Sequence, residues 1–206
     1  MVELFTSQGC SSCPPADQLL SSFVKAGAVS GRSVAALSFH VDYWNDLGWA
    51  DPFSTPAWTE RQRQYAQALG DNRVYTPELV VSGQAGFVGS NASAIKQAIA
   101  RAPRPAKLAA TSTWAADRLD ITATAPADAD VLVAVFESGK RTKVTRGENS
   151  GETLANDHVV RRLERVAAAG QRGTLTIKLD PRWNNPGAVA FAQRADKRIV
   201  ASAELR

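Results

Sequence analysis

Cys10 and Cys13 are the only cysteines in this chain of 206 residues, and they lie three positions apart within the segment FTSQGCSSCPP (residues 5–15). A pair at this spacing can form a redox-active disulfide, supply two thiolates to a metal ion, or close a small structural loop. Two thiolates fall short of the four ligands that zinc prefers, and so small a ring removes little chain entropy. Thiol–disulfide exchange is therefore the favoured interpretation.

The elements around the pair place it at the start of a helix. Residues 2–7 alternate as in a strand, and the following CPPADQLLSSFVKAG carries apolar residues at helical spacing up to Gly27. Proline is tolerated in a helix only in the first turn, so Pro14 and Pro15 require the helix to begin at or just after the cysteines. Because a helix N-terminus stabilises a thiolate, we expect Cys10 to be a solvent-exposed nucleophile and Cys13 to resolve the mixed disulfide.

The next segments complete a unit that mixes strands and helices. Residues 33–41 read as a buried strand, which the helical crossover makes parallel to the first strand. An insertion at residues 42–72 carries a helix in STPAWTERQRQYAQALG, with Thr55 as its cap. A hairpin about Gly83 and a helix over residues 91–102 follow.

The pattern changes at the proline-containing segment RAPRPAK (residues 101–107). About seven short alternating strands follow, with turn residues between them, which is typical of an antiparallel β-sandwich. The sequence therefore predicts an α/β domain over residues 1–102, with the insertion at 42–72, followed by an antiparallel β-sandwich domain over residues 103–206.

The order strand, C-x-x-C, helix, strand, X-Pro, hairpin and helix resembles the thioredoxin fold over residues 2–102. This resemblance implies that the Thr76–Pro77 bond in YTPELVV is cis, lies against the cysteine pair and holds the substrate chain. The segments VELFTSQGCSSCPPAD, HVDYWNDLGWADPFSTPAWTERQRQYA and YTPELVVSG are similar to the domain-of-unknown-function (DUF) 1223 family of bacterial, usually exported, thioredoxin-like proteins. That likeness implies a thioredoxin-like first domain and a periplasmic or secreted location.

Several residues depart from the thioredoxin pattern. Ser11 and Ser12 stand between the cysteines, and Gly9 stands where a tryptophan is usual. The buried acid that assists proton transfer in thioredoxins falls at Leu4 by spacing, while Glu3 points to the other face of the strand. Two hydroxyls able to donate to the Cys10 sulfur favour its thiolate, so we expect an oxidant or isomerase rather than a general reductase.

The segment HVDYWND (residues 40–46) follows the second strand and is expected at the same sheet edge as the cysteines. His40 is a candidate proton shuttle, and Trp44 is a candidate for the surface that binds substrate. Both have simpler interpretations: His40 caps the strand, and Trp44 packs beneath the inserted helix.

Composition narrows the partners. The net charge of +4 is spread along the chain and does not predict a nucleic-acid footprint. No apolar run is long enough to span a bilayer, and no charged-then-apolar export signal precedes the first strand. The expected partners are protein or small-molecule thiols and disulfides and a redox partner protein, with no bound organic cofactor or metal.

Two alternatives use the same fold. In one, Cys10 and Cys13 hold Cu(I) with help from His40, because soft thiolates suit that ion. In the other, the thioredoxin-like domain is a scaffold whose cysteine pair reacts slowly with small disulfides.

Overall fold

The structure is a computed structural model that describes residues 1–71 and 73–205, and its chain forms two compact units. Unit 1 comprises Met1–Ala102 and Gly139–Val159, and unit 2 comprises Pro103–Ser138 and the chain from Val160 onward. The first segment of unit 1 ends at Ala102, and unit 2 begins at Pro103. Residues 139–159 were predicted to lie in the second domain but belong to unit 1, because Asn149 and Asn156 from this segment hydrogen bond to residues around the cysteines.

Unit 1 contains four strands in the order β6-β5-β1-β4. As predicted, β1 (Val2–Thr6) runs parallel to β4 (Ala36–His40), and β5 (Glu78–Val81) and β6 (Ala85–Val88) form an antiparallel hairpin. The register pairs Thr6 with His40 at the carboxyl ends of β1 and β4. Both side chains therefore lie at the sheet edge from which the cysteine loop leaves.

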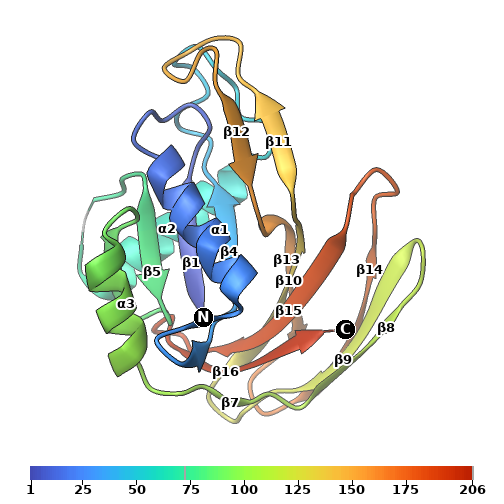
Figure 1. Ribbon diagram of the computed structural model, residues 1–206. Helices are drawn as coiled ribbons and strands as arrows, with labels where there is room; N and C mark the ends of the chain where they lie inside the picture. Colours follow the sequence, from blue (N-terminus) through green and yellow to red (C-terminus); the bar gives the residue numbers. More distant parts are fainter. Residues whose placement is uncertain (72, 206) are drawn as a thin grey trace. The chain divides into compact units, whose positions relative to one another are not determined.

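Helices cover both faces of these strands (Figure 1). On one face, α1 (Pro14–Ala26) and α3 (Ala92–Arg101) pack on an apolar core that includes Leu4 and Leu79. On the other, α2 (Pro56–Leu69) places Arg61 against Glu3, which confirms that Glu3 and Leu4 point to opposite faces.

The helix ends follow their capping residues. α1 ends at Gly27, whose left-handed φ of 63° lets its amide close the last turn. α2 begins after Thr55, whose hydroxyl accepts a hydrogen bond from the Ala57 amide, and has Pro56 at its first position. These boundaries agree with the sequence prediction.

Two short strand pairs differ from the prediction. The expected strand over residues 33–41 begins only at Ala36, because Arg32–Ser33 (β3) turns back to pair with Ala28–Val29 (β2). Lys140–Lys143 (β11) and Thr153–Asn156 (β12) form an antiparallel pair that was not predicted. KRTK is polar throughout, and TLAN is too short to show the alternation by which strands are identified.

Unit 2 is made of strands arranged in the orders β13-β10-β15-β16-β7 and β14-β9-β8. Residues from both sets share one apolar core, including Leu119, Val133, Ile177 and Ala190. The strands are β7 (Ala106–Lys107), β8 (Ala110–Trp114), β9 (Arg118–Thr124), β10 (Asp130–Glu137), β13 (Val159–Ala167), β14 (Arg172–Lys178), β15 (Pro186–Gln193) and β16 (Ile199–Leu205). The protein is thus mixed α/β and rich in strands.

Within the described part of the chain, no helix is long and apolar enough to cross a membrane.

Candidate functional site

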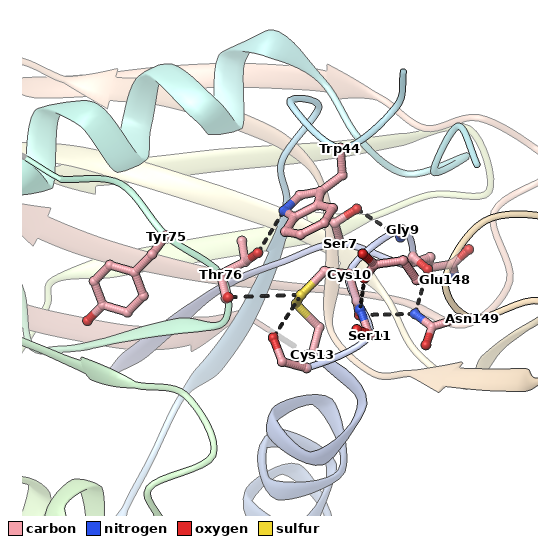
Figure 2. Close-up of a disulfide and its surroundings, with 12 residues drawn as sticks. Ser7, Gly9, Cys10, Ser11, Cys13, Trp44, Tyr75, Thr76, Glu148 and Asn149 are labelled. Carbon is pink, nitrogen blue, oxygen red and sulfur yellow. Dashed lines mark hydrogen bonds between the residues drawn. A yellow bond between two sulfur atoms is a disulfide. The ribbon is translucent and has the colours of Figure 1, made fainter. Parts of the chain in front are cut away.

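Cys10 and Cys13 form a disulfide at the start of α1 (Figure 2). Cys13 is the N-cap residue, and its carbonyl accepts hydrogen bonds from the amides of Ala16 and Asp17. The Cα atoms of the pair are 5.5 Å apart, which suits a disulfide. This confirms that the helix begins directly after the cysteines. Its positive end therefore favours a thiolate whenever the disulfide opens.

The peptide bond between Thr76 and Pro77 is cis, as the resemblance to thioredoxins implies. The carbonyl oxygen of Thr76 lies 3.9 Å from the Cys10 sulfur. Pro77 is buried and directly precedes β5. The structure therefore brings both cysteines together with Thr76 and Pro77.

The serines between the cysteines are exposed, but the cysteines are not. The Ser12 hydroxyl lies 3.3 Å from the Cys10 sulfur and, because a disulfide sulfur carries no hydrogen, it donates that bond. Cys10 and Cys13 each have a relative exposure of 0%. The expectation that the Cys10 sulfur projects into solvent is therefore wrong for this state of the protein.

The first reason for this burial is Trp44, in the loop between β4 and α2. Its indole nitrogen donates a 2.8 Å hydrogen bond to the Thr76 hydroxyl, which ties the loop to the cis-proline segment. Figure 2 shows the indole beside Cys10. A side chain at Gly9 would bring its Cβ within 3.1 Å of the Trp44 Cβ, so the glycine permits this close approach.

The second reason is the connection between β11 and β12. The buried side-chain amide of Asn149 donates to the carbonyl oxygens of Gln8 and Cys10, at 2.9 and 3.0 Å. Glu148 accepts a 3.0 Å hydrogen bond from the Ser11 amide, and hydrogen bonding by Ser11 holds the pKa of this exposed carboxyl below its usual value. We call Trp44, Glu148 and Asn149 the cover. They approach the cysteine loop from different sides (Figure 2).

His40 is buried at the end of β4, where its Nδ1 lies 2.7 Å from Asp51 Oδ2. Asp51 also accepts hydrogen bonds from the amides of Gln8 and Phe53. Burial works to raise the pKa of Asp51, but His40 and these hydrogen bonds outweigh it and hold the pKa below its usual value. His40 thus holds Asp51 beneath the cysteine loop, and its role as a proton shuttle remains a prediction.

The Cu(I) alternative calls for His40 as a ligand beside the cysteines. Across residues 1–71 and 73–205, no group of three or more His, Cys, Asp and Glu side chains is placed to hold a metal ion. The Nδ1 atom of His40 faces Asp51 instead. Binding of Cu(I) by the reduced cysteines with help from His40 therefore stays a prediction.

A family model described as "Protein of unknown function (DUF1223)" matches residues 1–193. The chain belongs to this family. The matched region spans both units, including the cysteine site and most of unit 2. A search of curated proteins finds no match.

A crystal structure of an Agrobacterium tumefaciens protein is similar to this DUF1223 chain, with a TM-score of 0.76 and 32% sequence identity. The similarity covers 99% of this chain and 92% of that one. A β-glucosidase from Kluyveromyces marxianus, solved with glucose, reaches a TM-score of only 0.22 at 16% identity. That match covers 48% of this chain and 14% of the enzyme, and no argument rests on it.

Several residues of the site were not identified from the sequence, among them Gln8, Asn149 and Asp17. Gln8 is buried and its side-chain amide donates to Thr142 and Asn156, which joins the cysteine loop to β11 and β12. Asn149 lies in the polar segment TRGENSG (residues 145–151), far in the sequence from the cysteine loop that it contacts. Asp17 is on α1, and its spacing of four from Cys13 is the one indication in the sequence that the two side chains share a helix face.

Proposed function

We propose that this DUF1223 protein pairs a thioredoxin-like unit with a β-sandwich and exchanges thiols and disulfides on exported proteins. One observation carries the proposal: a disulfide between Cys10 and Cys13 at the first turn of α1, beside the cis bond of Thr76 and Pro77. A helix start that stabilises a thiolate, next to a resolving cysteine, is the arrangement this chemistry needs.

The exchange proceeds through two displacements. The thiolate of reduced Cys10 attacks a disulfide of the partner, forms a mixed disulfide and releases one partner thiolate. Cys13 then loses its proton and attacks the Cys10 sulfur, which closes the Cys10–Cys13 disulfide and releases the second partner thiolate. The partner is reduced by two electrons and the protein is oxidised by two. The reverse sequence oxidises a dithiol.

The partner chain would lie along the backbone of Thr76 and Pro77, paired by strand-like hydrogen bonds. Trp44 occupies the approach to this backbone, because its indole is bonded to the Thr76 hydroxyl. Trp44 must therefore move for a partner to reach Cys10, and its indole then offers an apolar surface for that partner. The cover restricts exchange to partners that displace it.

The surroundings of Cys10 favour action as an oxidant or isomerase. The Ser12 hydroxyl, 3.3 Å from the Cys10 sulfur, and the start of α1 both stabilise the thiolate of the reduced protein. A stabilised reduced form makes the disulfide more oxidising. An oxidising compartment outside the cytoplasm, where disulfides persist, suits this direction.

The test is Cys13→Ser, which leaves Cys10 without its resolving partner. We expect this variant, isolated from the exported fraction of a host cell, to carry proteins bound through reductant-sensitive mixed disulfides. Mass spectrometry of the adducts should locate the bond at Cys10. The matched control is Cys10→Ser, which should carry few adducts. If Cys13→Ser traps neither a protein nor glutathione, thiol–disulfide exchange is not the function.

A structural role is the second candidate, and the burial of both cysteines favours it. In that case the disulfide ties the start of α1 to the cysteine loop and is not turned over. The two functions differ in the rate at which glutathione reduces the disulfide in the native protein. Reduction only at the rate of global unfolding would establish the structural role, whereas faster reduction requires a local opening of the cover.

A further inference from the structure

The face of the sheet beneath α1 changes character along its length. It is apolar at Val2, Leu4 and Ala36, and becomes polar at Thr6 and His40, toward the carboxyl ends of the strands. The polar end lies beneath the cysteine loop. Burying polar groups costs free energy, whereas burying apolar side chains does not. The presence of polar side chains at this buried place therefore calls for an explanation.

Asp17 reaches this polar end from α1. The Asp17 amide donates to the Cys13 carbonyl at 3.1 Å, so the two residues are one helical turn apart. Residues at this spacing lie on the same face, with Cβ atoms about 5–6 Å apart. Both residues are buried, with relative exposures of 5% and 0%. Asp17 is therefore the carboxylate that shares a buried face with Cys13.

The side chains around Asp17 do not hold its carboxyl group in a strong ion pair or hydrogen bond. Burial raises the pKa of Asp17 to about 7; the charge of His40 and the side chains of Thr6 and Asn156 oppose the rise, and the charge of Asp51 adds to it. Despite this proximity, no hydrogen bond of normal geometry reaches Asp17 Oδ1 from the described residues. The carboxyl is therefore able to gain and lose a proton near neutral pH.

We propose that Asp17 is the proton acceptor for Cys13 during exchange, an inference that rests on the proposed function. In the mixed disulfide, the Asp17 carboxylate takes the proton of the Cys13 thiol. The Cys13 thiolate attacks the Cys10 sulfur, forms the Cys10–Cys13 bond and releases the partner as a thiolate. Asp17 then returns the proton to solvent when the cover opens. In the oxidising direction, protonated Asp17 supplies the proton to the departing Cys13 thiolate.

The test separates the two displacements. The reduced protein is mixed with 5,5′-dithiobis(2-nitrobenzoate), whose coloured thiolate is released once when Cys10 is attached and again when Cys13 resolves the adduct. In Asp17→Asn, we expect the first release to keep its rate within twofold. The second should slow about 100-fold at pH 7, as expected when a general base is lost. Ser21→Ala, which alters a buried side chain one turn further along α1, should change neither phase.

The pH profile of the wild-type protein provides a readout that does not depend on a variant that folds. The rate of the second release should level off with an inflection near neutral pH, and Asp17→Asn should lose that inflection. An equal second rate and an unchanged profile in Asp17→Asn would overturn the role of Asp17 and leave exchange intact. If the wild-type protein shows no first release, the proposed function itself fails.

A third measurement detects the coupling without any exchange. In Cys10→Ser, the thiolate absorbance of Cys13 is followed against pH, with and without Asp17→Asn. A neighbouring carboxylate opposes formation of the thiolate, so removal of its charge should move the Cys13 titration to lower pH. Identical titration curves would contradict the proposed proximity of the two groups.

Discussion

Trp44 lies beside Cys10, with its indole nitrogen bonded to the Thr76 hydroxyl and its Cβ close to Gly9, so we expect it to limit access to the Cys10 sulfur. In Trp44→Ala we expect a phosphine reductant to open the disulfide of the native protein at least about tenfold faster. The reason is that the substitution removes the hydrogen bond and exposes the sulfur without touching either cysteine. The measurement is the rate of thiol appearance under native conditions.

Trp183→Ala is the matched control, since this partly buried tryptophan belongs to unit 2. It should leave the rate of reduction within about twofold of the wild-type rate. If Trp44→Ala reduces no faster than Trp183→Ala, the indole does not limit access, and the segment that contains Glu148 and Asn149 must provide the barrier.

The connection between β11 and β12 is fixed to the cysteine loop through Asn149, which satisfies two buried carbonyl oxygens at once. In Asn149→Ala the Gln8 carbonyl loses this donor, and the Cys10 carbonyl keeps only the Cys13 amide at 3.2 Å. An unsatisfied buried acceptor costs about 1–3 kcal/mol. We expect the free energy of unfolding to fall by about 2 kcal/mol or more, as measured by denaturant titration of the oxidised protein.

Glu148→Gln tests the exposed contact beside it. Its carboxylate accepts from the Ser11 amide at the surface, and a glutamine oxygen can still accept that bond. We expect the free energy of unfolding to stay within the error of the same denaturant titration. A loss as large as that of Asn149→Ala would show that the charge of Glu148, rather than the buried amide of Asn149, holds the segment in place.

The helices and parallel strands of unit 1 could be predicted because local residues determine them. Pro14 limits where α1 begins, Gly27 ends it, and Thr55 caps α2. The cis bond at Pro77 could be predicted only from family resemblance, because no local pattern separates it from a trans bond.

The cover could not be predicted, because its parts lie far apart in the sequence. Asn149 donates a hydrogen bond to the carbonyl of Cys10, which lies 139 positions earlier in the sequence. A polar segment such as GENSG gives no indication of which residues it contacts. The exposure of Cys10 was predicted from its place at the start of a helix, whereas the burial of its sulfur depends on these distant contacts. Asp17 was overlooked because a carboxylate in the first turn of a helix is ordinarily a surface residue that stabilises the helix end.

Stability of the whole protein should depend on pH through Asp17. Its pKa rises from 3.8 in the unfolded chain to about 7 on folding, so the folded state binds the proton more tightly. The stability that this proton contributes is complete below about pH 3.8 and is lost as pH rises through about 7. The full effect is on the order of 4 kcal/mol as an upper limit.

Comparison with Asp17→Asn isolates this effect, because Asp51 and other carboxylates make their own contributions in both proteins. Relative to the wild-type protein, Asp17→Asn should gain stability between pH 5 and pH 8, as measured by thermal unfolding at each pH. A difference between the two proteins that stays constant over this range would mean that Asp17 does not change protonation there.

The long separation between the cysteines and Asn149 has a consequence for biosynthesis. The ribosome makes Cys10 139 residues before it makes Asn149, the buried amide that later bonds to the Cys10 carbonyl. Throughout that interval the nascent chain carries a reactive pair that lacks the Glu148 and Asn149 part of its cover. The order of translation therefore leaves a period in which cellular oxidants can reach sulfurs that the finished molecule conceals.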